Sequence, residues 1–358
     1  MNPLSVLGSS DFSLNIESFG LKGSDSVFLS TCRGAENLVL DTISERNPNI
    51  RKVALIPPFT CNTVIEPFLK HGYQVVSYSI DGALNVDLDK FREVLIATSA
   101  QVVLVHRYFG FDTLKDFEKI ISEFSPKGIV FIEDRTQCLY STFNQLPVDY
   151  IIGSIRKWAG LPDGGFAVCK TGVFTNKPHV YNEELERLKL EASYAKYEYL
   201  HKNSGDKQNF LDLFRQAEQQ LDSETSYFKI SPSSVVIQQN LDSSILKKKR
   251  RENYSFLYEG LKDSDILEFL MPKLTEVEIP LYFVMSVKGR NELQRYLQLH
   301  DIYAPIVWSK PEVYPDICKE VQNIYDSILC LPVDQRYDVD DMNRIIKCIK
   351  EYREYVNN

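Results

Sequence analysis

Short apolar runs recur through the first half of the chain. Six of them are rich in Val and Ile and are predicted to be buried strands: residues 53–57, 74–79, 101–106, 128–133, 149–154 and 165–169. Stretches with helical spacing separate several of these runs: residues 33–43, 62–71, 87–96 and 113–124. Because the strand runs are nearly continuous rather than alternating, both faces of each strand are expected to be covered. The pattern predicts an α/β fold with a mostly parallel sheet flanked by helices.

The pattern changes after about residue 180. Residues 183–202 and 209–222 are polar with helical spacing, and a long helical pattern that includes the basic run 247–251 ends near Leu261. An alternation then resumes, with a strand at 278–287, a helix at 289–300, a strand near 303–308 and a final helix at 339–354. We therefore expect a large domain at residues 1–240 and a smaller α/β domain at residues 241–358.

Composition and charge exclude several classes of protein. The 358 residues are enough for two cores. A net charge of -8 argues against nucleic acid or an anionic membrane as the main ligand. The basic run 247–251 lacks interleaved aromatic residues, so it is interpreted as a solvated helix face.

Targeting and cysteine patterns favour a cytoplasmic protein. No apolar run reaches the roughly 18 residues that span a bilayer, and the first twenty residues lack a basic start followed by an apolar stretch. The seven cysteines are scattered, without a CxxC pair or metal-ligand spacing. We expect free thiols in a reducing compartment and no metal site.

Ligands of parallel α/β sheets bind at the carboxyl ends of the strands. Asp134 follows the strand at 128–133 and would point into that crevice, although an aspartate there is also typical of a helix N-cap. Lys157 follows the next strand and precedes Trp158 and a Gly-Gly pair at 164–165. Apolar surroundings would disfavour the charged form of Lys157 and make it a competent amine nucleophile. The alternative is an ordinary solvated loop lysine.

Anion-binding groups occur near the same strand ends. The segment 31–35 precedes a helical stretch, and its free amides could bind a phosphate together with the Ser154 hydroxyl. The alternative is that the segment is an ordinary helix cap. His106, Arg107 and Arg156 also end strands or follow them, and each could contact a ligand or have a structural role. Together these residues supply what pyridoxal phosphate (PLP) needs: a lysine, a carboxylate for the ring nitrogen and a phosphate site.

These motifs resemble the DegT/DnrJ/EryC1/StrS group of PLP-dependent aminotransferases, with the aspartate-aminotransferase fold (PLP transferase fold type I, with a seven-stranded sheet). The resemblance runs from about residue 25 to about residue 350. It rests on the following segments: Thr-Cys-Arg-Gly-Ala at 31–35, Pro-Phe-Thr-Cys at 58–61, Asn-Val-Asp at 85–87, Glu-Asp-Arg-Thr-Gln at 133–137, Ser-Ile-Arg-Lys at 154–157, Gly-Gly at 164–165 and Cys-Leu-Pro-Val at 330–333.

The resemblance implies a role for each residue of the site. Lys157 would hold the cofactor through a Schiff base and carry protons between substrate and cofactor. Asp134 would pair with the pyridinium nitrogen and Gln137 would lie near the ring and its phenolic oxygen. The residues expected around the phosphate are Ser154 and the backbone of Arg33 and Gly34.

The chain departs from the group at three places. Cys61 stands where many relatives have an aromatic ring that stacks on the cofactor, so we count Cys61 among the cofactor-binding residues, with Phe59 or Tyr108 as alternative stacking partners. The Gly-Thr-x-Ala turn of many relatives is Cys-Arg-Gly-Ala at 32–35, and the segment 229–233 lacks their Tyr-Asn-x-Arg asparagine.

The resemblance implies transfer of an amino group from an amino acid, expected to be glutamate, to a keto sugar. A nucleotide-linked keto sugar of surface-polysaccharide or secondary-metabolite synthesis is the expected acceptor, and a homodimer is expected. One alternative is an aminotransferase for a small ketone without a nucleotide. Another is a non-catalytic, regulatory PLP-binding protein, against which the presence of both Lys157 and Asp134 argues.

Overall fold

The computed structural model describes residues 13–223, 226–314 and 317–357. The prediction that the first twenty residues contain no secretion signal concerns a segment that lies mostly outside the described residues. The larger sheet has seven strands in the order β1-β7-β6-β5-β4-β2-β3. These strands are β1 (Asp25–Leu29), β2 (Val53–Ile56), β3 (Gln74–Ser77), β4 (Val102–His106), β5 (Val130–Asp134), β6 (Tyr150–Ser154) and β7 (Gly165–Cys169). Only β7 runs against its neighbours, so the prediction of a seven-stranded, mostly parallel sheet is confirmed.

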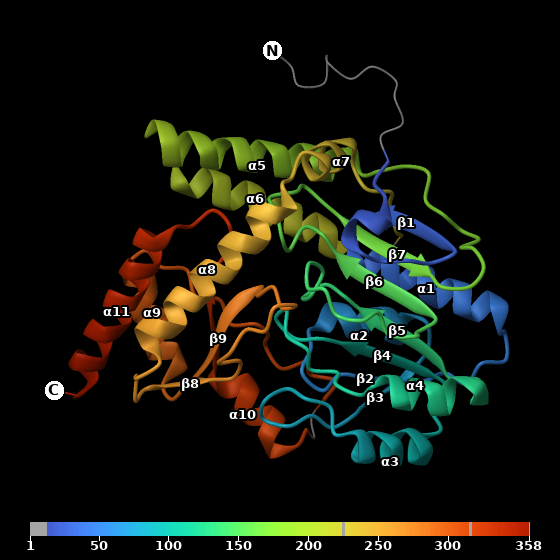
Figure 1. Cartoon of the computed structure of the whole chain (residues 1–358). Helices are drawn as coiled ribbons and strands as arrows, with labels where there is room; N and C mark the ends of the chain where they lie inside the picture. Colours follow the sequence, from blue (N-terminus) through green and yellow to red (C-terminus); the bar gives the residue numbers. More distant parts are fainter. Residues whose placement is uncertain (1–12, 224–225, 315–316, 358) are drawn as a thin grey trace.

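Helices cover both faces of this sheet (Figure 1). The helices of this half are α1 (Cys32–Arg46), α2 (Asn62–Lys70), α3 (Leu88–Thr98) and α4 (Glu118–Phe124). In β4, Val102 and Leu104 belong to the apolar cluster beneath α1 and α2, whereas Val103 and Val105 belong to the cluster shared with α3 and α4. Burial of both strand faces explains why the apolar runs are continuous in the sequence.

A pair of long helices follows β7. These are α5 (Glu183–Lys202) and α6 (Lys207–Ser223), which pack on each other through Leu185, Leu188, Ala217 and Leu221. In Figure 1 they lie at the top of the molecule, beside α7 (Pro232–Gln239). The predicted helices at 183–202 and 209–222 correspond to α5 and α6. Residue 240 lies in the link between α7 and α8 (Ser243–Leu261), and a domain boundary there stays a prediction.

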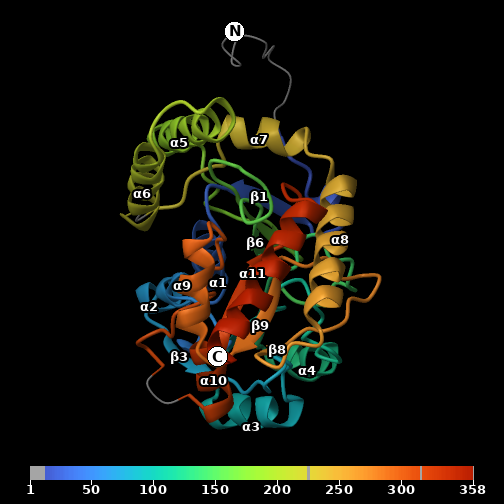
Figure 2. The same cartoon turned by 90° about the vertical axis from the view of Figure 1, so that its left-hand side faces the viewer.

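The C-terminal part contains a second, antiparallel sheet in the order β10-β9-β8. Its strands and helices are β8 (Leu267–Phe269), β9 (Tyr282–Val287), α9 (Arg290–Leu299), α10 (Lys319–Ser327), β10 (Ile328–Pro332) and α11 (Val339–Asn357). Figure 2 shows α8, α9 and α11 grouped around this sheet. None of the described helices is long and apolar enough to cross a membrane.

The predicted strand near 303–308 is wrong. These residues are irregular, and β10 takes the place beside β9. Pro305 has no backbone N–H to give to a ladder, and its carbonyl accepts a single hydrogen bond of 3.0 Å from the Cys330 amide. The segment instead carries Trp308 towards the large sheet, where its ring packs on Phe59 at a centroid distance of 5.3 Å.

Candidate functional site

The carboxyl ends of β4, β5 and β6 open into a cavity of about 300 Å³. The last residues of these strands, His106, Asp134 and Ser154, all line it. The complete lining consists of Thr31, Cys32, Arg33, Glu36, Cys61, Thr63, Val64, His106, Asp134, Thr136, Gln137, Ser154, Arg156, Lys157, Glu218, Leu221, Asp222 and Trp308. The structure thus brings together the predicted catalytic and cofactor-binding residues except Gly34, whereas three other candidates, Phe59, Tyr108 and Arg107, lie outside the lining.

Asp134 is buried at the end of β5, with 4% of its surface exposed. Its Oδ1 accepts a 2.7 Å hydrogen bond from the Thr136 amide and lies 3.9 Å from the Cys32 Sγ. Burial raises the pKa of Asp134 to about 6, although hydrogen bonds from Thr136 and the charge of Lys157 act in the opposite direction. The Asp134 anion therefore lacks full compensation within the protein, and a cation bound in the cavity would stabilise it.

Lys157 lies three residues beyond the end of β6. The residue is exposed, because the cavity is open to solvent at this point, and its side chain makes no hydrogen bond or ion pair with the described part of the chain. The protein around the cavity partly desolvates the amine and so lowers its pKa, and the neighbouring positive charge of Arg156 lowers it further. An amine without a partner and with a lowered pKa is suited to act as a nucleophile.

Trp158 fixes the backbone next to this lysine. Its ring is buried, and its Nε1 donates a 2.8 Å hydrogen bond to the Thr136 carbonyl, which joins the Lys157 loop to the Asp134 loop. The Arg250 guanidinium lies over the Trp158 ring at 4.8 Å, and its Nη2 donates to the Trp158 carbonyl at 3.4 Å. The two predicted reactive groups are therefore held on connected loops.

The N-terminus of α1 borders the cavity at Thr31, Cys32 and Arg33. Thr31 is the N-cap, and its Oγ1 accepts a 2.9 Å hydrogen bond from the Gly34 amide. The Cys32 and Arg33 amides begin the helix and have no partner within it. The geometry thus favours the Arg33 amide over the Gly34 amide as a hydrogen-bond donor to a bound anion. Ser154 also lines the cavity, and its Oγ donates a 3.3 Å hydrogen bond to the Gly164 carbonyl.

A close approach at Gly165 positions this helix. A Cβ on Gly165 would lie 2.3 Å from the Thr31 carbonyl carbon and oxygen. Gly165 faces Leu29 of β1 on one side and Ser154 of β6 on the other. Glycine therefore allows the α1 N-terminus, Ser154 and the cavity to come together. Gly164 has φ +143, a backbone conformation that other residues rarely adopt, so the two glycines of the pair are required for different reasons.

Both arginines in the lining are paired with acids of α6. Arg33 donates at 2.9 Å to Asp222 and at 3.3 Å to Glu66 of α2. Arg156 donates at 3.2 Å to Glu218, which also pairs with Lys189. The sequence gives no local sign that Glu218 and Asp222 belong to the site, because their position depends on how α6 packs.

The aromatic surface of the cavity differs from the expected one. Phe59 and Tyr108 are 0% and 1% exposed and do not line the cavity. Trp308 and His106 line it instead, with ring centroids 5.9 Å apart. Burial lowers the pKa of His106 to about 3, although a hydrogen bond with the Phe59 backbone acts in the opposite direction. The imidazole is therefore neutral near pH 7. The Phe59 and Tyr108 alternatives are therefore disfavoured as stacking partners.

The remaining predicted residues have simple positions. Gln137 lines the cavity, and its Oε1 accepts a 2.8 Å hydrogen bond from the Phe109 amide. Cys61 caps α2 and its Sγ lies 2.9 Å from the Thr63 Oγ1. Arg107, in contrast, is buried outside the cavity lining and pairs with Glu133 and with Asp112 at 2.8 Å, which is a structural role.

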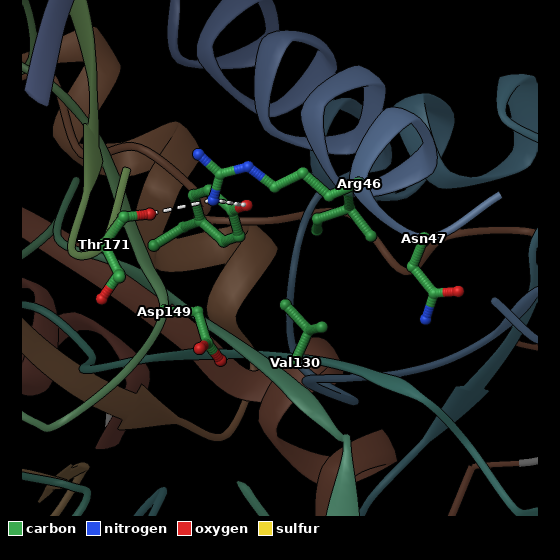
Figure 3. Close-up of a pocket in the computed structure, with 7 residues that line it drawn as sticks. Arg46, Asn47, Val130, Asp149 and Thr171 are labelled. Atoms are coloured by element: carbon green, nitrogen blue, oxygen red, sulfur yellow. Dashed lines mark hydrogen bonds between the residues drawn. The ribbon is translucent and has the colours of Figure 1, made fainter. Parts of the chain in front are cut away.

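A smaller cavity of about 130 Å³ lies at the other ends of β5 and β6 (Figure 3). Figure 3 shows Arg46 of α1 reaching across it, and its Nη1 donates to the Tyr150 Oη at 3.1 Å and to the Thr171 carbonyl at 3.0 Å. The Asp149 Oδ2 accepts a 2.8 Å hydrogen bond from the Phe131 amide. Because these polar groups have protein partners, we assign the chemistry to the larger cavity.

No family model matches the chain, and no curated protein matches its sequence. Its structure is similar to the aminotransferase TlmJ from Streptoalloteichus hindustanus, with 16% identity, a TM-score of 0.69 and coverage of 97% of this chain and 91% of that chain. A DegT DnrJ EryC1 StrS aminotransferase from Brucella abortus gives 15% identity, a TM-score of 0.66 and coverage of 94% and 87%.

A third similar structure is the PMP form of Spr1654 from Streptococcus pneumoniae, described as a sugar aminotransferase. It has 15% identity, a TM-score of 0.69 and coverage of 97% of this chain and 91% of that chain. The PLP form of the same protein also matches, with 15% identity and a TM-score of 0.65. The chain therefore has the fold of the DegT/DnrJ/EryC1/StrS aminotransferases, as its motifs indicated.

Proposed function

We propose that the chain is a PLP-dependent aminotransferase in which Lys157 holds the cofactor. The observation that carries this proposal is the pairing of two groups in one cavity. The Lys157 amine has no partner among the described residues, and the Asp134 carboxyl ends the strand next to the one that precedes Lys157. The structural similarity to aminotransferases, including PLP and PMP forms of Spr1654, supports the same conclusion.

The donor set fits the cofactor. A protonated pyridine nitrogen would supply the cation that Asp134 lacks, since burial holds the pKa of this carboxyl near 6. The α1 N-terminus and the Ser154 hydroxyl offer donors to a phosphate. Two buried polar atoms of the lining, Glu36 Oε1 and His106 Nε2, have no partner within the described chain, which is the mark of a surface that a polar ligand completes.

The bound cofactor supplies an electron sink that stabilises negative charge on the substrate carbon. Asp134 keeps the ring nitrogen protonated, which that sink requires. Lys157 would hold the cofactor covalently and would move a proton between carbon atoms, and the direction of its pKa shift favours the neutral amine. Trp158 holds the Lys157 and Thr136 backbones together, so that the amine keeps its place relative to Asp134.

The acceptor is proposed to be the carbonyl group of a sugar, most simply a nucleotide-linked keto sugar, with glutamate as donor. The description of Spr1654 supports a sugar, and Arg156 offers a guanidinium to a carboxylate or phosphate. A small ketone is the alternative acceptor, and a regulatory PLP-binding protein is the alternative function. Action as a cytoplasmic homodimer remains part of the proposal.

Absorbance spectroscopy tests the function. The purified protein loaded with PLP should be yellow, and glutamate should bleach it as the amino group moves to the cofactor. Lys157→Ala should abolish turnover and the bleaching, whereas Lys127→Ala, at an exposed lysine, should change neither. A yellow protein that no amino donor bleaches would support the regulatory alternative, and near-normal turnover of Lys157→Ala would refute the site.

A further inference from the structure

Glu36 of α1 is a buried acid in the cavity, to which neither the sequence motifs nor the proposed function assigns a role of its own. It is 1% exposed and lines the cavity, and its Oε1 has no hydrogen-bond partner among the described residues. Glu36 follows Cys32 by one helical turn, so both residues lie on the same face of α1, and both line the cavity. A buried carboxyl without a partner costs stability unless a ligand satisfies it.

The charges around Glu36 disfavour its ionised form. Burial raises the pKa of Glu36 well above its ordinary range, the charges of Asp134 and Cys61 raise it further, and only Arg33 acts in the opposite direction. The Arg33 guanidinium is directed at Asp222 and Glu66 rather than at Glu36. The other ionisable groups of the lining are Cys32, His106, Arg156, Lys157 and Glu218.

A neutral carboxylic acid carries one O–H donor, whereas a carboxylate only accepts. An ionised Glu36 one turn from the α1 N-terminus would repel an anion bound there. A protonated Glu36 would instead add a donor to the amides of the first turn. The burial of Glu36 and its acidic neighbours thus favour the state that suits an anionic ligand.

We propose that Glu36 is a cofactor-contacting residue whose carboxyl group donates a hydrogen bond to the phosphate group bound at the α1 N-terminus. This inference rests on the proposed function, because it takes the ligand to be a pyridoxal-type phosphate ester. It adds an acidic side chain to a phosphate site that otherwise consists of amides and the Ser154 hydroxyl.

Calorimetric binding of pyridoxine 5'-phosphate tests the contact without turnover, because this alcohol cannot react with Lys157. Glu36→Leu should bind about tenfold more weakly than the wild type, the loss of one hydrogen bond to a charged acceptor. Glu36→Gln keeps an N–H donor in the same shape and should bind within about threefold of the wild type. Unphosphorylated pyridoxine should bind the wild type and Glu36→Leu equally.

Thermal unfolding of the ligand-free variants separates this role from a structural one. Glu36→Leu removes a buried carboxyl without a partner, so its Tm should equal or exceed that of the wild type while its affinity falls. Wild-type affinity in Glu36→Leu, an equal loss in Glu36→Gln, or an equal loss for pyridoxine would overturn the proposal. Failure of the wild type itself to bind pyridoxine 5'-phosphate would instead refute the proposed function, and the role of Glu36 with it.

Discussion

Gly165→Ala tests how the backbone builds the phosphate end of the cavity. The added Cβ would lie 2.3 Å from the Thr31 carbonyl atoms and 2.6 Å from the Cys32 nitrogen. These neighbours are backbone atoms, so no side chain can rotate away to make room. Relief of the contact requires β7 and the start of α1 to separate by about 1 Å, in a core that tolerates little change of volume.

Such a separation has two measurable consequences. Overpacking with a backbone shift costs about 3 kcal/mol of the free energy of unfolding, at the upper end of its usual range. The same shift moves the α1 N-terminus away from Ser154, which pairs with Gly165 across the sheet. A displacement of about 1 Å in an active site can lower turnover roughly a hundredfold.

Urea unfolding and steady-state transamination measure these effects on one protein preparation. Gly160→Ala is the matched control, since Gly160 lies three residues after Lys157 and a Cβ there would meet no atom within 4 Å. Its free energy of unfolding should change by less than about 0.5 kcal/mol, and its turnover should be normal. If Gly165→Ala were as stable and as active as Gly160→Ala, our account of how α1 is positioned would be wrong.

The other predictions concern Asp134 and Arg250. The folded cofactor-free protein holds the proton of Asp134 more tightly than the unfolded chain, because its pKa is raised from 3.8 to about 6. The free energy of unfolding should therefore fall as pH rises from 4 to 6, by up to about 3 kcal/mol from Asp134. Urea unfolding of Asp134→Asn should not show this contribution. Identical pH profiles of the wild type and Asp134→Asn would contradict the raised pKa of Asp134. Arg250 donates to the carbonyls of Pro280, Leu281 and Trp158, so Arg250→Ala should lose about 3 kcal/mol of unfolding free energy. Arg250→Lys should recover only part of this stability, because one ammonium group cannot reach all three carbonyl oxygens. A loss below about 1 kcal/mol in Arg250→Ala would contradict the role given to these hydrogen bonds.

The sequence predicted the elements whose burial is uniform. Strands β2 and β4 to β7 are apolar runs covered on both faces, whereas β3 is a partly exposed edge strand, and the approximate positions of all six were correct. The edge strand β1 was missed because its residues Asp25 and Ser26 do not give an apolar run. The strand predicted near 303–308 failed because Pro305 cannot donate to a ladder and Trp308 turns to the cavity, where it packs on Phe59.

The same contrast holds for the candidate site. Asp134 and Lys157 could be found because strand ends of parallel sheets converge on one edge. Trp308 and the α6 acids Glu218 and Asp222 come from distant segments, and their arrival depends on tertiary packing. One sequence feature could have indicated Glu36: it is a charged residue beside the apolar positions of the helix at 33–43. In the structure it is buried together with those positions.

Chemical trapping of the cofactor tests the central claim most directly. The PLP-loaded protein would be reduced with borohydride, digested and mapped by mass spectrometry. Our account predicts one phosphopyridoxyl group per chain, on Lys157. Label on another lysine, or spread over many exposed lysines with Lys157 unmodified, would contradict it.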